Sequence, residues 1–153
     1  MEVKLIRLIL LYMVCILLSG CVTPPPLSDS PISLPTTFNE VWYRPTLETS
    51  GFFVMTDTGT VTVRTNGIAF VGKKELREIS YEKIQRISFG RVRSDFINNW
   101  VTIKYRDGEA DSYALFSGGK VFGLGGGGDA ARIFQTIRFA LNQKGLDSVV
   151  EKQ

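Results

Sequence analysis

Short segments that alternate apolar and polar residues, each followed by a tight turn, constrain the fold of this chain most strongly. The clearest is Trp100–Tyr105, in which every second residue from Val101 onward is large and apolar. A period of two is typical of a strand that buries one face. Asp107-Gly108 follows directly and predicts a hairpin turn. The pattern therefore favours an antiparallel sheet built from strands that are neighbours in the sequence.

Several other segments repeat this pattern at short intervals. The Asn66-Gly67 pair predicts a hairpin in which both residues take a positive φ. The strands expected in addition to Trp100–Tyr105 are Thr60–Val63, Ile68–Val71, Leu76–Ile79, Ile84–Phe89 and Tyr113–Phe116. The composition becomes that of a globular domain from Phe38 onward, where large apolar residues such as Trp42 and Tyr43 appear.

One amphipathic helix is predicted after the strands. Asp129 suits the N-cap position, and Lys144 followed by Gly145 suits the end of the helix. Between them, one stripe is apolar and comprises Ile133, Phe134, Ile137, Ala140 and Leu141. Strands followed by a single helix predict an α+β fold, mostly β, in which the helix packs on a curved sheet.

The order and spacing of these elements resemble a known family. The segment GTVTVRTNGIAFVGKKELREISYEKIQRISFG, then WVTIKYRDG, then a terminal helix, is similar to the bacterial PH-like and GRAM-like domains. The resemblance covers about residues 50 to 144. It implies a bent antiparallel sheet or small barrel, with the C-terminal helix closing one open end.

The start of the chain has the features of a secretory signal. Lys4 and Arg7 precede an uncharged apolar stretch, Leu8–Leu18, which is too short to span a bilayer but fits a signal peptide. Leu18-Ser19-Gly20-Cys21 then closely resembles the lipobox of bacterial lipoproteins. The resemblance implies cleavage before Cys21, a diacylglycerol thioether on its sulfur and a further acyl chain such as palmitate. Val22 in place of Asp implies the outer membrane if the source is Gram-negative. An ordinary secretory signal is the alternative.

The chain is therefore expected to divide into four parts. Residues 1–20 are the signal peptide that is removed. Residues 21–37 are the lipidated cysteine and a Pro/Ser-rich tether, because this stretch holds five of the six prolines and cannot bury enough apolar surface to fold. Residues 38–145 are the PH-like domain, and residues 146–153 are a frayed tail. A Pro-rich peptide ligand is the alternative for the tether.

Composition argues against most catalytic chemistry. The chain has no histidine, and its two cysteines lie at or before the lipobox, so the usual zinc ligands and the commonest bases and nucleophiles are missing. The net charge of +3 is too small to argue for nucleic acid. Gly123, Gly125 and Gly128 form G-x-G-x-x-G, but no βαβ unit surrounds them, so a connecting loop is the simpler interpretation. We predict no enzyme activity, no cofactor and no metal.

Two sets of acidic residues lie close enough in the sequence to be candidates for paired catalytic carboxylates. Glu75, Glu78 and Glu82 alternate with basic residues, and Glu109 and Asp111 flank a turn, so solvated charge is the simpler account of both.

The remaining candidates are contact residues. Basic side chains between residues 73 and 93 could meet an anionic surface or a partner, or could simply be the charged face of edge strands. The candidates are Lys73, Lys74, Arg77, Arg91 and Arg93. Trp100 could stack on a glycan or a partner, but packing in the core or under a loop is favoured.

The expected function is therefore binding. We predict a lipid-anchored, extracytoplasmic protein of the cell envelope whose domain binds another envelope protein. The alternative is a lipid- or small-ligand-binding module that acts through the basic face or the barrel mouth.

Overall fold

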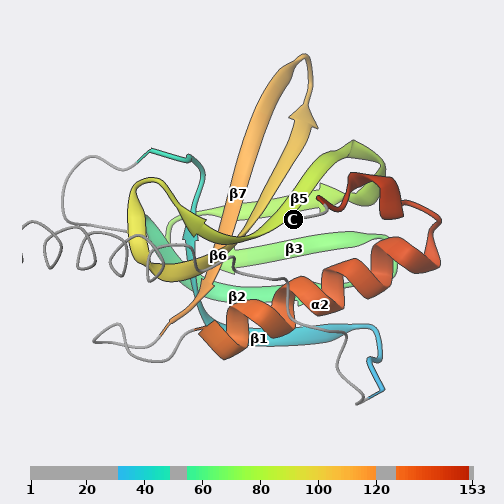
Figure 1. Cartoon of the computed structure of the whole chain (residues 1–153), viewed down its shortest axis with the longest axis horizontal. Helices are drawn as coiled ribbons and strands as arrows, with labels where there is room; N and C mark the ends of the chain where they lie inside the picture. The colour runs from blue at the N-terminus through green and yellow to red at the C-terminus, as the bar shows by residue number, and fades with distance from the viewer. Residues whose placement is uncertain (1–30, 49–54, 120–126, 152–153) are drawn as a thin grey trace, which may run out of the picture.

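A computed structural model describes residues 31–48, 55–119 and 127–151. It contains one seven-stranded antiparallel sheet and one long helix, α2, packed on one face of that sheet (Figure 1). The strands are β1 (Thr36–Arg44), β2 (Asp57–Val63), β3 (Gly67–Gly72), β4 (Leu76–Ser80), β5 (Ile84–Val92), β6 (Asp95–Asp107) and β7 (Ala110–Gly118). The helices are η1 (Tyr81–Lys83), α2 (Gly127–Gln143) and η2 (Asp147–Val149).

The sheet consists of two meanders joined through the first strand. Strands lie in the order β4-β3-β2-β1-β7-β6-β5, so β1 pairs with both β2 and β7 and occupies the centre. The edge strands β4 and β5 do not pair with each other, so the bent sheet is open and not a closed barrel. The prediction of a mostly β fold with a bent antiparallel sheet and a C-terminal helix is confirmed.

The core lies between the sheet and α2. The apolar stripe of the helix is fully buried, as predicted: Ile133, Phe134, Ile137, Ala140 and Leu141 are all 0–1 % exposed. Val101, Ile103 and Tyr105 of β6 face the same core, as their alternation indicates. Burying such side chains stabilises the fold by roughly 1.5–3 kcal/mol each. The helix therefore supplies the second layer that the sheet needs.

The end of α2 follows the predicted pattern, whereas its start does not. Gly145 has a φ of 70°, its N–H donates to the Asn142 carbonyl, and the Leu146 N–H donates to the Leu141 carbonyl. These two bonds form a Schellman motif with Gly145 at C′. The helix begins at Gly127, so Asp129 lies in its first turn and is not the N-cap.

Two further expectations differ from the structure. The β2–β3 hairpin is closed by the Arg64 N–H donating to the Gly67 carbonyl, and neither Asn66 nor Gly67 has a positive φ. The strands pair up to Val63 and Ile68, which leaves a four-residue loop in place of the two-residue turn. Residues 146–151, expected to fray, form η2 and a bridge between Val150 and Ile87 of β5.

Candidate binding groove

A groove of about 750 Å³ lies beside the hairpin of β6 and β7. This hairpin projects from the body of the domain at the top of Figure 1. Residues from the end of β1 onward form one wall, and Arg77 of β4 and Tyr105 of β6 contribute to the others. The lining is Pro45, Thr46, Leu47, Glu48, Arg77, Tyr105, Asp111, Ser112 and Tyr113. The groove therefore opens where the two meanders of the sheet diverge.

The groove runs along an unpaired part of β7. β7 pairs with β6 from Ala110 to Phe116, but it pairs with β1 only from Leu115 to Gly118. Beyond Arg44 the chain leaves β7, so the stretch from Ala110 to Ala114 has a neighbour on one side only in the described part of the chain. Asp111, Ser112 and Tyr113 all line the groove although alternate residues point to opposite faces. The groove thus borders the edge of the strand.

The backbone groups that face this edge follow from the pairing pattern. The Glu151 N–H donates to the Ile87 carbonyl, so Ile87 faces away from β6. Ile103, opposite Ile87, therefore bonds toward β7 and its partner Ala114. Because the direction alternates along a strand, the N–H and C=O groups of Asp111 and Tyr113 point away from β6.

The pairing of β7 with β1 gives the same direction for these backbone groups independently. The Tyr43 carbonyl accepts a bond from the Thr56 N–H, so Tyr43 faces β2 and Arg44 faces β7. Arg44 is paired with Leu115. Because Tyr113 is two residues before Leu115, its N–H and C=O groups point to the same side of β7 as those of Leu115. The outward N–H and C=O groups of Asp111 and Tyr113 therefore lie on the same side of β7 as the backbone groups of Leu115, which pair with β1.

Buried aromatic rings of the core lie close to the groove residue Arg77. Tyr43 stacks on Phe70 with ring centroids 4.5 Å apart and an interplanar angle of 23°, and it also contacts Phe116. Burial, followed by the charge of Glu75, raises the pKa of the Tyr43 hydroxyl to about 12. Burial likewise raises the pKa of Tyr105. Both phenols are therefore neutral at physiological pH, and of the two only Tyr105 lines the groove.

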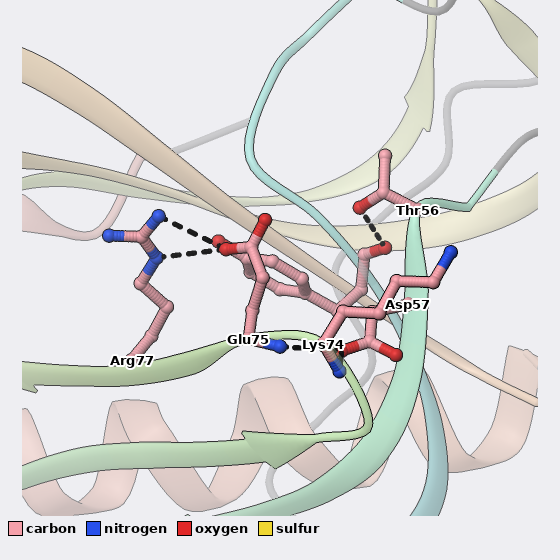
Figure 2. A network of polar contacts seen from close by, with 6 residues as sticks. Thr56, Asp57, Lys74, Glu75 and Arg77 are labelled. Carbon is pink, nitrogen blue, oxygen red and sulfur yellow. Dashed lines mark hydrogen bonds and ion pairs between the residues drawn. The ribbon is translucent and has the colours of Figure 1, made fainter.

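The turn between β3 and β4 is fixed by one buried carboxylate. Asp57 is 6 % exposed and accepts backbone N–H bonds from Thr58, Lys73, Lys74 and Glu75 at 2.8–3.2 Å. Figure 2 shows this carboxylate beside the turn that carries Lys74. Burial alone would raise the pKa of Asp57, but the four donors outweigh it and lower the pKa.

Gly72 allows this close approach. A Cβ atom at Gly72 would lie 2.1 Å from an oxygen of Asp57. A side chain there would therefore displace the carboxylate from the turn.

Arg77 is held at the rim by Glu75, the last residue of the β3–β4 turn. Its Nε and Nη2 atoms both donate to one oxygen of Glu75, at 3.1 and 3.0 Å (Figure 2). Burial would lower the pKa of Arg77, but the bond to Glu75, together with the interaction with Tyr43, outweighs it and raises the pKa. The guanidinium is therefore charged and oriented beside the groove.

The negative charge of Asp111 is compensated by two cations on β6, the opposite strand of its hairpin. Its carboxylate lies 2.6 Å from the Lys104 ammonium and 3.5 Å from the Arg106 guanidinium. These cations, with a hydrogen bond to Gln85, lower the pKa of Asp111. The edge of β7 at the groove therefore carries little net charge.

Trp100 lies outside the groove. It is 0 % exposed, and its indole N–H donates to Asp95 at 2.8 Å. Arg44 lies over its ring at 4.5 Å from the centroid. Near this cluster, Ser94 donates to the Leu47 carbonyl, so the turn between β5 and β6 folds back toward β1. The prediction that Trp100 is packed in the protein, in the core or under a loop, is confirmed by its complete burial.

The predicted basic contact residues occupy two places. Lys73 and Lys74 lie in the β3–β4 turn and Arg77 follows on β4, whereas Arg91 is on β5 and Arg93 lies in the β5–β6 turn. β4 and β5 are the opposite edges of the sheet, and within the described residues no hydrogen bond or ion pair joins the two groups. Only Arg77 lines the groove.

Three of the five acidic residues that the sequence offered as paired carboxylates occur in ion pairs. Glu75 contacts Arg77, Glu78 contacts Arg64, and Asp111 contacts Lys104 and Arg106. In residues 31–48, 55–119 and 127–151, no three metal-ligating side chains gather. The structure brings these carboxylates to cations, as the interleaved charges indicate.

Some sequence predictions concern parts of the chain outside the described residues. These include Cys21, the signal peptide, and Gly123 and Gly125 of the glycine run. Conversely, the sequence pattern predicts no strand where β1 lies, so it marks neither Tyr43 nor Thr46–Glu48 as site residues. A bulge between Phe38 and Val41, with Glu40 at a φ of 56°, hides the period of two in this strand.

Comparison with protein families and with curated proteins identified no relative of this chain. No model of a protein family matches the chain, and no curated protein matches it. None of the helices that the structure describes is long and apolar enough to cross a bilayer.

Proposed function

We propose that this protein is a lipid-anchored, non-catalytic binding module of the bacterial cell envelope, and that its PH-like domain binds another envelope protein. The observation that carries the proposal is the groove beside the unpaired edge of β7. A groove bordered by unused backbone donors and acceptors is suited to binding a polypeptide. It lies on the side of the domain where the β6–β7 hairpin projects (Figure 1).

The anchor is supported by the sequence Leu18-Ser19-Gly20-Cys21. Each buried CH₂ contributes about 0.8 kcal/mol, and two or more acyl chains give stable membrane attachment. The first strand begins at Thr36, so about 15 residues separate Cys21 from the sheet. A Pro-rich segment of this length gives the domain reach from the membrane surface.

A non-catalytic role is supported by how the buried carboxylates are used. Asp57 and Asp95 each accept several hydrogen bonds that fix the local backbone, at the β3–β4 turn and at the start of β6, and the pKa of each is lowered despite burial. A general acid needs the opposite shift, toward neutral pH. These two residues are therefore structural anions.

A small ligand is the second candidate for the groove. Its volume falls within the range of ligand pockets, roughly 300–1,000 Å³, and it is lined by tyrosines, hydroxyls and a charged guanidinium. Such a ligand would use Tyr105 and Arg77 without needing the strand edge.

In-cell cross-linking of the lipidated protein, followed by identification of what is attached, tests the proposal. We expect one stoichiometric envelope protein. Recovery of the monomer alone would contradict the binding role and favour the small ligand.

The anchor is tested separately with Cys21→Ala. We expect an uncut precursor or a form released from the membrane, because the only thiol at the lipobox is gone. Normal processing and membrane retention of this variant would contradict lipid attachment.

A further inference from the structure

We infer that the unpaired edge of β7, Ala110–Ala114, binds an extended peptide segment of the partner as an added strand. This inference rests on the proposed function and specifies the form in which the partner is recognised. Main-chain hydrogen bonds to a sheet edge supply affinity in this mode, and pockets for alternate side chains supply specificity.

The backbone provides the first part of the argument. The N–H and C=O groups of Asp111 and Tyr113 point away from β6, and in the described residues no strand pairs with them. Successive outward residues on one strand present donors and acceptors at the spacing of an antiparallel ladder. A peptide strand can therefore extend the row that begins at the Arg44–Leu115 pair.

The groove provides the second part. Side chains of an added strand alternate between the two faces of the sheet. On the inner face they would meet Tyr105 and Ser112, with Leu47 and Arg77 also lining the groove; on the outer face they would meet Tyr113 and Asp111. The partner segment should therefore carry apolar residues at alternate positions, facing the 5 % exposed Tyr105.

The other edges of the sheet show why β7 is the candidate. The chain itself covers part of the β5 edge, where Val150 bridges to Ile87 and Glu151 pairs with Arg86. β4 bears the charged residues Arg77 and Glu78 at successive positions, which discourages edge pairing although each is in an ion pair. The β7 stretch Ala110–Ala114 carries a single charged residue, Asp111, which is paired with Lys104, and this stretch borders the groove.

The tether is a poor occupant for this edge. Residues 22–37 contain five prolines, and proline has no N–H to donate to a ladder. A segment of another protein therefore fits the edge better than this part of the chain.

The test uses the purified full chain and a displayed library of random eight-residue peptides. We expect enriched peptides with apolar residues at alternate positions and no proline in the centre. One synthetic peptide from the selection is then titrated against Asp111→Ala and Asp111→Pro. Both variants lose the carboxylate, but only the proline removes the outward N–H.

We expect Asp111→Pro to weaken peptide binding about tenfold relative to Asp111→Ala, since one main-chain bond and its unsatisfied partner are lost. Equal affinities, or no enriched peptide, would overturn the inference. Because the proline variant could also disturb folding, amide exchange of the wild-type chain is measured with and without peptide. Slower exchange at Asp111 and Tyr113 supports the inference, and slowing only elsewhere overturns it.

Two outcomes separate this inference from the function on which it rests. A photo-cross-linker at Tyr113 that stays unattached in cells, while the same protein is captured through another surface, refutes the strand addition alone. A Tyr113-to-Tyr113 adduct between two copies would show that the edge pairs with itself and would also refute a foreign segment.

Discussion

At the scale of single residues, buried polar groups determine the shape of the turns. Asp57 and Asp95 are both almost fully buried. Asp57 takes hydrogen bonds from N–H groups of the β3–β4 turn, and Asp95 takes its own from Ile97, Asn98 and Trp100 at the start of β6. Their ionised forms are stabilised locally, with no paired cation required. One carboxylate thus positions the β3–β4 turn, and the other positions the first residues of β6.

Replacing Asp57 with Asn should destabilise the domain by about 2–3 kcal/mol, because an amide oxygen accepts more weakly than a carboxylate and its NH₂ faces other donors. The exposed Asp107→Asn is the matched control and should change little. Urea unfolding of both variants measures the difference. A loss at Asp57 no larger than at Asp107 would show that the turn does not depend on this carboxylate.

The same residue predicts the direction of acid unfolding. The pKa of Asp57 is lower in the folded state than its ordinary value of 3.8, so the unfolded chain takes up its proton first. Its contribution is present at neutral pH and is lost as the pH falls from about 5 through the folded pKa. Asp57→Asn should therefore lose less stability than wild type between pH 6 and pH 3. If the free energy of unfolding falls equally with pH in the two proteins, this prediction is contradicted.

Arg44 presents the opposite case, a buried cation with little compensation. It is 0 % exposed, and in the described part of the chain its three guanidinium nitrogens have no hydrogen-bond partner. Burial lowers its pKa, although the charge of Asp95 acts in the other direction. Arg44→Met should leave stability unchanged or raise it by about 1–2 kcal/mol, since replacing a buried ion by an apolar side chain is often favourable.

Thermal unfolding of Arg44→Met, with the exposed Arg132→Met as control, measures this effect. A loss of more than about 2 kcal/mol would mean that stacking on Trp100 outweighs the desolvation of the charge.

At the scale of elements, the period of the sequence identified those parts whose geometry is regular. The β6 strand and α2 follow their predicted faces residue by residue, because one face of each is buried against the other. β1 could not be predicted from the sequence because its bulge shifts Phe38 and Val41 out of the two-residue period of a strand. The order of the C-terminal segment could not be predicted because it depends on a bridge to Ile87, far away in the sequence.

Gly145→Ala should destabilise the domain by about 1 kcal/mol, because its φ of 70° is unfavourable for a residue with a Cβ atom. Lys144→Ala, one residue earlier, is the control and should have little effect. Chemical denaturation compares the two. Equal stability of both variants would show that the Schellman motif is not needed to end α2.

At the scale of the whole molecule, the sequence predicted the architecture but could not predict the groove. The groove depends on where β1 stops pairing with β7, and this follows from the departure of the chain after Arg44. The basic residues were visible in the sequence, yet only the fold shows that they divide between the two edges of the sheet. Edges and their coverage are properties of the complete topology.

Amide hydrogen exchange along β7 of the full chain tests the central claim most directly. We predict fast exchange at Asp111 and Tyr113, and slow exchange at Ser112 and Ala114, which bond to β6, and at Leu115, which bonds to β1. This alternation would show an edge that is open for a partner strand. Uniformly slow exchange from residue 111 to residue 115 would mean that the edge is already covered, and it would contradict the proposed mode of binding.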